Sequence, residues 1–405
     1  MNRANLFRAN LNIAVLFAVV FALLANSLLG PLTPLCVIAF IPLFAVINRH
    51  RMAHVIASAS PVLVLPLFAL SSVIWSQAPE NTLRYGAYYL LTIVTGSMIG
   101  AGMRPQDALK GLFLGLLIVG LLNFALGDYS VIETGTAAFR GIQGSKNAAG
   151  ELAGAAVLVS LAMISQAWLY RSFFWFLLAT SGLVIAVITL VLSKATGALI
   201  ATGVAVPCMI CWLVSMRMDL QVRTAIFLTV MILVAVMILT MNLWLPGMFE
   251  LVLESSGKEV GLTGRDLLWQ AADRQIAQKP WLGGGYNAFW VPENLEAIRL
   301  WGEMGIKTQM GFNFHNTWRE ILVDLGYIGL TIYAIVAIAS TLVVIFRTML
   351  KPTITLVMAS ALLVYFAIKM PFETFGFGGM HLLTLILFMC WAMGYSSLLN
   401  ARQKL

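Results

Sequence analysis

Long, uninterrupted apolar segments separated by short polar connections dominate the chain. Each segment is close to the ~20 residues that an α-helix needs to cross a bilayer. Continuous runs exclude an outer-membrane barrel, whose strands alternate apolar and polar positions over shorter segments. The pattern therefore predicts an all-α integral membrane protein with about twelve transmembrane helices, at residues 11–29, 31–47, 55–75, 85–103, 108–126, 148–166, 172–192, 196–215, 224–244, 318–346, 353–370 and 380–399.

The longest break in the apolar pattern lies between the ninth and tenth predicted helices, at residues 245–317. A segment of this length is functional, disordered or a small domain. Its aromatic residues, Trp269 and Trp301 among them, argue against disorder. We therefore predict three parts: helices 1–9 in 1–244, a large, partly helical outer loop with site residues in 245–317, and helices 10–12 in 318–405.

Composition and charge support a membrane location. Hydrophobic residues make up 60 % of the chain and charged residues 10 %, against about 45–50 % and about 25 % in soluble proteins. The net charge of +8 is not combined with a basic groove and interleaved aromatics, so we expect no nucleic-acid partner.

The positive-inside rule places both termini in the cytoplasm. The inner loops then hold Arg3, Arg8, Arg49, Arg51, Arg104, Lys110, Arg171, Arg217, Arg223, Arg347, Lys351, Arg402 and Lys404.

The cysteines and acidic residues give no sign of a metal site. Cys208 and Cys211 form a C-x-x-C pair, but they lie in an apolar segment without a histidine partner or a polar loop. The outer segments contain no cluster of histidines and carboxylates at the spacing of metal ligands. We expect neither a metal nor another cofactor.

Residues 263–276 predict a short amphipathic helix in the outer loop. Thr263 and Asp266 have the spacing of a capping box. Arg265 then falls in the first turn, where free backbone N–H groups and the positive end of the helix dipole favour an anion such as phosphate. The alternative is that Arg265 pairs with Asp266 or Glu259.

A glycine run, Gly283 to Gly285, follows this helix. It lacks the G-K-[ST] ending of a phosphate-binding Walker loop. We interpret it as a tight turn that packs the loop against the membrane surface. Tyr286, Phe289 and Trp290 come directly after it, as in an interfacial aromatic belt.

His315 lies at the outer mouth of the tenth predicted helix, close to Asn316, Arg319 and Glu320. A lone histidine is more often structural than catalytic. Neutral imidazole is nevertheless the usual general base near pH 7, and neighbouring cations would keep it neutral. We therefore regard His315 as a candidate base.

Several charges lie in or near apolar segments, where they are functional candidates by default. Lys194 separates two apolar runs with almost no loop, and Lys369 and Glu373 flank a Met-Pro pair. We interpret Lys369 and Glu373 as a structural ion pair. Arg140 and Lys146 add cations on the outer face. Together with Lys194, Arg265, Arg319 and His315, they predict a site for an anionic lipid head group.

The motifs S-K-A-T-G, G-R-D-L-L-W, K-P-W-L-G-G-G-Y and F-H-N-T-W-R-E resemble those of the bacterial O-antigen ligase family. Its superfamily includes O-antigen polymerases and protein O-oligosaccharyltransferases. The resemblance implies a metal-independent glycosyltransferase of the inner membrane with a periplasmic active site. Such enzymes transfer a glycan from undecaprenyl diphosphate to a hydroxyl of lipid A–core in lipopolysaccharide biosynthesis.

The resemblance also implies roles for individual residues. His315 matches the family's base and Arg265 a diphosphate contact. Lys194 stands where the family usually has arginine, which keeps the charge but loses the bidentate fork. We expect a monomer that binds both lipid-linked substrates and membrane lipid. Its substrate-binding candidates are Lys194, Arg140, Lys146, Asn147, Arg319, Asn316, Trp269 and Tyr286.

Three alternatives stay open from the sequence. An O-antigen polymerase or a ligase that acts on a protein would share the motifs and differ only in the acceptor. A transporter of the lipid-linked glycan is the alternative from another class. Transporters often contain paired inverted repeats with broken helices. We find no such pairing, and the single elaborated outer loop favours an enzyme.

Overall fold

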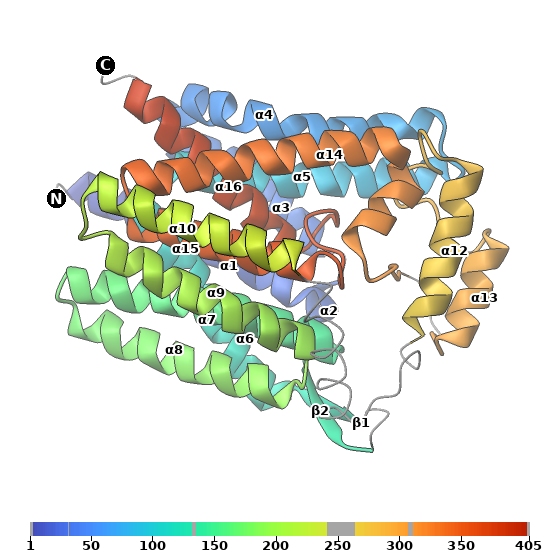
Figure 1. Cartoon of the computed structure of the whole chain (residues 1–405), viewed down its shortest axis with the longest axis horizontal. Coiled ribbons are helices and arrows are strands. Elements are labelled where there is room, and N and C mark those ends of the chain that lie inside the picture. Colours follow the sequence, from blue (N-terminus) through green and yellow to red (C-terminus); the bar gives the residue numbers. More distant parts are fainter. Residues whose placement is uncertain (1–2, 31, 132–134, 241–263, 307–310, 403–405) are drawn as a thin grey trace.

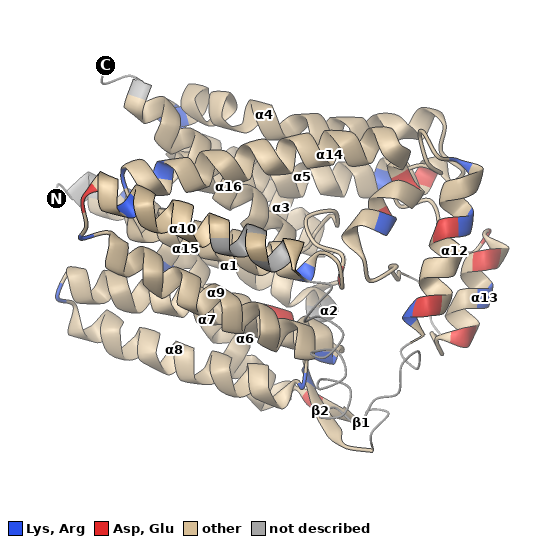
Figure 2. Ribbon diagram, viewed as in Figure 1, with Lys and Arg blue, Asp and Glu red and all other residues tan. Residues whose placement is uncertain are grey.

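Long, roughly parallel helices form a bundle, and one end of this bundle is covered by two shorter helices and a β-hairpin (Figure 1). The computed structural model describes residues 3–30, 32–131, 135–240, 264–306 and 311–402. Charged residues gather toward the two ends of the bundle, while the middles of the helices are almost free of them (Figure 2). This distribution is what a bilayer requires, since a charge at its centre is costly.

The long helices follow the predicted apolar segments closely. They are α1 (Arg3–Leu24), α3 (Leu32–Ile47), α4 (Met52–Ser71), α5 (Pro79–Gly102), α6 (Pro105–Leu126), α7 (Lys146–Leu169), α8 (Phe173–Leu192), α9 (Thr196–Ser215), α10 (Leu220–Leu239), α14 (Thr317–Leu350), α15 (Ile354–Lys369) and α16 (Leu382–Arg402). Within the described residues, eight helices are long and apolar enough to cross a membrane, and three further apolar helices are shorter. The all-α membrane class is thus supported, and the count of about twelve spans stays a prediction.

Short elements connect the long helices. They are α2 (Asn26–Leu29), the 3-10 turns η1 (Arg49–Arg51) and η2 (Ser72–Ile74), the antiparallel strands β1 (Asp128–Val131) and β2 (Ala137–Gly141), and the helices α12 (Arg265–Gln278) and α13 (Leu295–Glu303). Helices α12 and α13 lie across the end of the bundle (Figure 1). The described part of the predicted outer loop is therefore partly helical.

The aromatic residues of the outer loop are buried inside the protein. Tyr286, Phe289 and Trp290 are 1 %, 4 % and 6 % exposed. Phe289 and Trp290 form a second apolar core with residues of α12 and α13, with Phe314 and with the beginning of α14. The prediction of an interfacial aromatic belt is wrong here, because packing against α12 and α14 removes these rings from the surface.

Helix α14 has a sharp kink at Gly326, whose φ is 64° and ψ is −167°. This conformation is open essentially to glycine alone. The kink leaves backbone N–H and C=O groups of α14 without partners in the helix, and the segment 280–285 forms hydrogen bonds with them. Four backbone hydrogen bonds join the two segments: Tyr327 N to Pro280 O (2.8 Å), Ile328 N to Trp281 O (3.1 Å), Gly284 N to Val323 O (2.8 Å) and Gly285 N to Asp324 O (2.9 Å). The predicted glycine turn thus packs against the kinked helix.

We expect Gly326→Ala to destabilise the protein. An added Cβ would lie 2.3 Å from the Trp281 carbonyl, and the backbone strain costs about 1–3 kcal/mol. Thermal unfolding in detergent should show a midpoint lower by several degrees. Gly302→Ala in α13 is the matched control, since its Cβ would meet nothing within 4 Å. Equal midpoints for the two variants would show that the kink is not required.

Small residues bring α7 close to its neighbours. A Cβ at Gly150 would lie 2.5 Å from the Ala195 Cβ, and one at Gly154 would lie 2.5 Å from the Thr202 Oγ1. The pair has the small-xxx-small spacing that lets membrane helices approach. Helix α7 therefore packs tightly on α9 and α15, which positions the polar residues at its N-terminal end.

Candidate functional site

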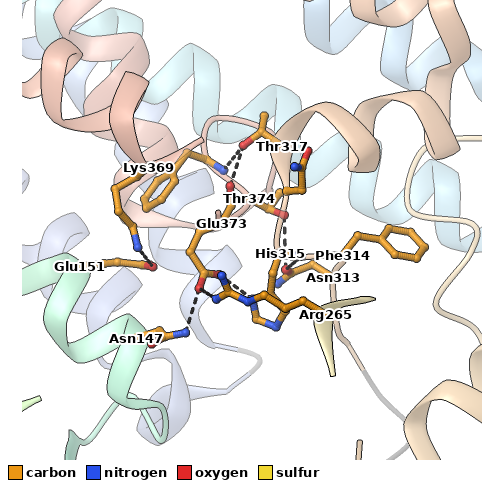
Figure 3. Close-up of polar contacts among 12 residues, drawn as sticks. Asn147, Glu151, Arg265, Asn313, Phe314, His315, Thr317, Lys369, Glu373 and Thr374 are labelled. Atoms are coloured by element: carbon orange, nitrogen blue, oxygen red, sulfur yellow. Dashed lines mark hydrogen bonds and ion pairs between the residues drawn. The ribbon is translucent and has the colours of Figure 1, made fainter. Parts of the chain in front are cut away.

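The carboxylate of Glu373, in the loop between α15 and α16, joins three residues that are far apart in the sequence (Figure 3). Its Oε2 lies 2.6 Å from Nδ1 of His315. Its Oε1 accepts hydrogen bonds from Nη2 of Arg265 at 2.9 Å and from Nδ2 of Asn147 at 2.8 Å. We call these four residues the Glu373 cluster. It unites α7, α12, the segment before α14 and the loop before α16.

The cluster is largely buried but still accessible. The Glu373 side chain is 8 % exposed, and those of His315 and Arg265 are 23 % and 26 % exposed. The two catalytic candidates predicted from the sequence thus lie together and can be reached from outside. An ionised group that is partly buried interacts more strongly with its neighbours than one in open water.

The N-terminus of α14 holds the loop that carries Glu373. Thr317 Oγ1 donates to the Glu373 carbonyl at 2.8 Å and accepts from the Phe375 N–H at 2.9 Å. Asn316 donates through Nδ2 to the Pro371 carbonyl at 2.9 Å. Its side-chain oxygen also caps α14 by accepting from the backbone of residue 319. The predicted substrate contact Asn316 therefore has a clear positioning role.

The backbone of His315 is held in a left-handed conformation, with φ of 49°. Few non-glycine residues adopt it, so the surroundings must enforce it. Asn313 Oδ1 accepts from the His315 N–H at 2.8 Å, as in an Asx turn. Glu320 Oε2 accepts from the Phe314 N–H at 2.7 Å. The ring of Phe312 meets the imidazole edge-on at 5.4 Å, so backbone and ring are both fixed.

Charge in the cluster is balanced around Glu373. Burial raises the pKa of this carboxyl, but the hydrogen bond from His315 and the charges of His315, Lys369 and Arg265 outweigh it, and the pKa lies below its usual value. Glu373 is therefore ionised at neutral pH. An ionised carboxylate only accepts hydrogen bonds, so Nδ1 of His315 is the donor.

This arrangement leaves Nε2 of His315 available to take a proton. Within the described ranges, no hydrogen bond to Nε2 is formed. We expected nearby cations to keep the imidazole neutral, but its direct partner is a carboxylate, and the cation Arg265 contacts the other oxygen of that carboxylate. A carboxylate stabilises the imidazolium once it forms, which is what a general base needs.

A second ion pair borders the cluster. Lys369 Nζ lies 3.1 Å from Glu151 Oε1, and both side chains are buried. The predicted Lys369–Glu373 pair is therefore wrong in its partner, because close packing of α7 on α15 brings Glu151 to the lysine. Lys369 is still near enough to Glu373 to lower its pKa.

A cavity of about 270 Å³ lies beside this ion pair. Its polar lining comes from Asn26, Gln143, Glu151 and His381. The side-chain nitrogen and oxygen of Gln143 are buried and have no hydrogen-bond partner among the described residues. Buried polar groups normally find a partner, so the cavity is suited to a hydroxyl-bearing ligand.

Other predicted site residues have partners away from Glu373. Arg140 in β2 pairs with Asp128 at 2.6 Å. Arg319 pairs with Asp273 at 3.0 Å, and its guanidinium lies 4.7 Å from the centre of the Trp269 ring. Trp269 Nε1 also donates to the carbonyl of residue 314 at 2.9 Å. The contacts of Arg319 and Trp269 connect α12 to α14 and to the segment that holds His315.

The remaining candidates occupy three different settings. The Tyr286 hydroxyl is buried and donates to the Phe377 carbonyl at 2.6 Å. Lys146 begins α7, directly before Asn147 of the cluster. Lys194 lies exposed in the turn between α8 and α9, with φ of 50°.

Arg265 lies in the first turn of a helix, as predicted, but α12 begins at this residue and not at Thr263. Gly264 is the N-cap and provides no side-chain hydrogen bond. The arginine pairs with Glu373, whereas the sequence suggested Asp266 as a partner. Two further residues named in those predictions lie outside the described residues: Thr263 and Glu259.

Glu373 is the member of the cluster whose role the sequence analysis missed. A usable signal was present, since a carboxylate follows a proline directly after an apolar helix, and such charges are functional candidates. The predicted ion pair between Glu373 and Lys369 rested only on their closeness in the sequence. The three observed partners of Glu373 are Asn147, Arg265 and His315, which come from distant segments.

Two comparisons with known proteins found similar sequences. Residues 181–334 match the family described as O-antigen ligase. Over 349 residues the chain is 29 % identical to the exopolysaccharide production protein ExoQ of Rhizobium meliloti (strain 1021). The aligned region covers 84 % of this chain and 78 % of the relative. The family match contains Arg265 and His315. The resemblance seen in the motifs is thereby confirmed: over residues 181–334 the chain is similar to the O-antigen ligase family.

Proposed function

We propose that this protein transfers a glycan from undecaprenyl diphosphate to a hydroxyl of lipid A–core, without a metal, as a monomer on the periplasmic face of the inner membrane. Its termini would lie in the cytoplasm. The observation that carries the proposal is the Glu373 cluster, which combines an oriented histidine with an arginine at a helix N-terminus. Such a pair suits a reaction in which a hydroxyl oxygen of the acceptor loses its proton while a diphosphate leaves the donor.

His315 would act on the acceptor. Its Nε2 takes the proton of the sugar hydroxyl as that oxygen attacks the anomeric carbon of the donor. Glu373 holds Nδ1 at 2.6 Å and stabilises the imidazolium that results. The bond from the anomeric carbon to the diphosphate oxygen breaks in the same step, so one displacement inverts the anomeric configuration.

Arg265 would act on the leaving group. The diphosphate departs with negative charge, and a fixed guanidinium at the positive end of α12 stabilises that charge. Nη2 contacts Glu373, and the guanidinium has further donors for phosphate oxygens. Lys194, from the turn before α9, is the second cation that we assign to the diphosphate.

The cavity beside Glu151 supports a sugar subsite next to the cluster. Amide, carboxylate and imidazole groups are the partners that sugar hydroxyls use. The Gln143 amide, which has no partner among the described residues, offers a donor and an acceptor there. Apolar residues such as Leu152 complete its wall. We expect it to hold sugar hydroxyls close to the reacting centre.

Removing the guanidinium should slow transfer strongly. We expect Arg265→Ala to lower kcat by about 10²–10³-fold, the usual cost of losing a donor to developing charge. Arg265→Lys should recover part of the rate, because charge remains while the planar fork is lost. The readout is initial rate of transfer with purified protein.

Arg274→Ala is the matched control for this experiment. Arg274 is on the same helix, is exposed, and pairs with Glu296 on the surface. We expect it to leave the rate within twofold of wild type. A folded Arg265→Ala protein with the control's rate would remove Arg265 from the mechanism.

The ExoQ relative supports a second candidate, extension of a growing polysaccharide, because that protein is named for exopolysaccharide production. The acceptor distinguishes the two. Purified protein with undecaprenyl-diphosphate-linked glycan, lipid A–core and excess chelator should give glycosylated lipid A–core. Lengthening of the donor glycan alone would indicate a polymerase, and labelling of an added pilin would indicate a protein ligase.

A further inference from the structure

A basic pocket of about 270 Å³ lies at the opposite end of the bundle from the Glu373 cluster. Helix α14 begins beside the cluster at Thr317 and reaches the pocket at Arg347. From Gly326 to Arg347 it rises about 30 Å, which is the thickness of the hydrocarbon core of a bilayer. The pocket therefore lies at the level of the opposite membrane surface.

Three cations from different elements line this pocket: Arg51 before α4, Arg347 near the end of α14 and Lys351 after it. Among the residues that the structure describes, no aspartate or glutamate is part of its lining. Hydroxyl groups complete the polar wall, and they come from Thr353, Thr355, Ser396 and Ser397. The described part of the lining thus offers hydrogen-bond donors and positive charge without a carboxylate.

One of the three cations is buried: the Arg347 residue is only 6 % exposed. Its Nε donates to Ser397 Oγ at 3.1 Å. Among the described residues, no ion pair includes Arg51, Arg347 or Lys351. A buried charge without a counter-ion is costly.

One acidic residue close in sequence to the pocket wall is already paired. Asp107 follows Pro105 of the pocket wall, and both of its oxygens bind Arg104, at 2.8 Å and 3.2 Å. The positive-inside tendency explains exposed cations such as Lys351. It does not explain a buried arginine that lines a cavity.

The N-terminus of α15 adds a further positive element. Thr353 is its N-cap and accepts from the Leu356 N–H at 3.3 Å. Thr355 and Leu356, in its first turn, line the pocket. The positive end of this 16-residue helix therefore points at the same space as the cations.

We infer that this pocket binds the phosphate of an anionic phospholipid from the leaflet on that side of the membrane. Converging cations, hydroxyls and a helix N-terminus are the groups that recognise a phosphate. A lipid is the source because the pocket lies at head-group depth, and apolar residues such as Met103, Leu356 and Met393 line it beside the cations. The inference does not depend on the reaction at the Glu373 cluster.

The test measures lipid binding by the purified full-length protein in neutral detergent. Phosphatidylglycerol, phosphatidylcholine and inorganic phosphate are added separately, and the thermal midpoint and lipid retention in native mass spectrometry are recorded. We expect phosphatidylglycerol to raise the midpoint and stay bound. Lys351→Gln should weaken this binding about fivefold, and Arg51→Gln together with Lys351→Gln should weaken it more.

Arg217→Gln is the control, since Arg217 is exposed after α9 and lies outside the pocket lining. We expect it to bind phosphatidylglycerol like wild type. Lys351 is exposed, so its substitution leaves folding intact even if Arg347→Gln does not fold. Unchanged binding in the double variant would overturn the site, and equal stabilisation by inorganic phosphate without lipid retention would overturn the lipid.

Discussion

Replacing His315 with asparagine will lower glycan transfer by about 10²–10⁴-fold, the contribution of a general base. Asparagine is among the residues that tolerate the left-handed backbone found at this position. Its side-chain amide can still donate to Glu373. The substitution therefore removes the proton acceptor while it keeps the local structure. Initial transfer rates and thermal midpoints of the two proteins are the measurements.

His50→Asn is the matched control, because His50 is exposed in η1 at the other end of the bundle. It should leave the rate unchanged. If His315→Asn folds and transfers glycan at a comparable rate, His315 is not the base. Loss of folding in His315→Asn alone would instead assign the residue a structural role.

Glu373→Gln will lower the transfer rate by about 10²-fold, the cost of a misplaced reacting group. The change removes the charge that three donors share, from His315, Arg265 and Asn147. Glutamine cannot accept all three hydrogen bonds, so the imidazole loses its fixed orientation. We expect the fall mainly in kcat. Glu303→Gln, on the exposed surface of α13, should have no effect.

The same variant tests the charge state of Glu373. The folded protein holds the pKa of this carboxyl below its usual value. Its stabilising contribution is therefore complete above the usual glutamate pKa and is lost as the pH falls through the lowered one. Unfolding midpoints measured from neutral to acidic pH should show this loss in wild type. The Glu373→Gln protein should be less stable than wild type at neutral pH, and its unfolding midpoint should not show this loss at acidic pH.

Local patterns predicted local features well. Apolar runs of bilayer length predicted the long helices, and a short amphipathic pattern predicted a helix over 263–276 that has Arg265 in its first turn. His315 was recognised at the mouth of α14 because a polar segment precedes a long apolar run. These features depend on residues that are close in the sequence.

Features that depend on distant segments could not be predicted. The partner of Lys369 is Glu151, more than two hundred positions away, and it follows from the packing of α7 on α15. Burial of the outer-loop aromatics follows from the docking of α12 on α14. The kink at Gly326 could not be predicted, because a straight and a kinked helix can have the same apolar sequence pattern. Tertiary packing supplied each of these contacts.

The most direct test of the central claim is a transfer assay with purified wild type and His315→Asn in excess chelator. The donor is undecaprenyl-diphosphate-linked glycan, and lipid A–core is the acceptor. We predict that wild type forms glycosylated lipid A–core and that the variant, with an unchanged thermal midpoint, forms at least a hundredfold less. Near-equal transfer by the two folded proteins would contradict the assignment of the Glu373 cluster as the catalytic site.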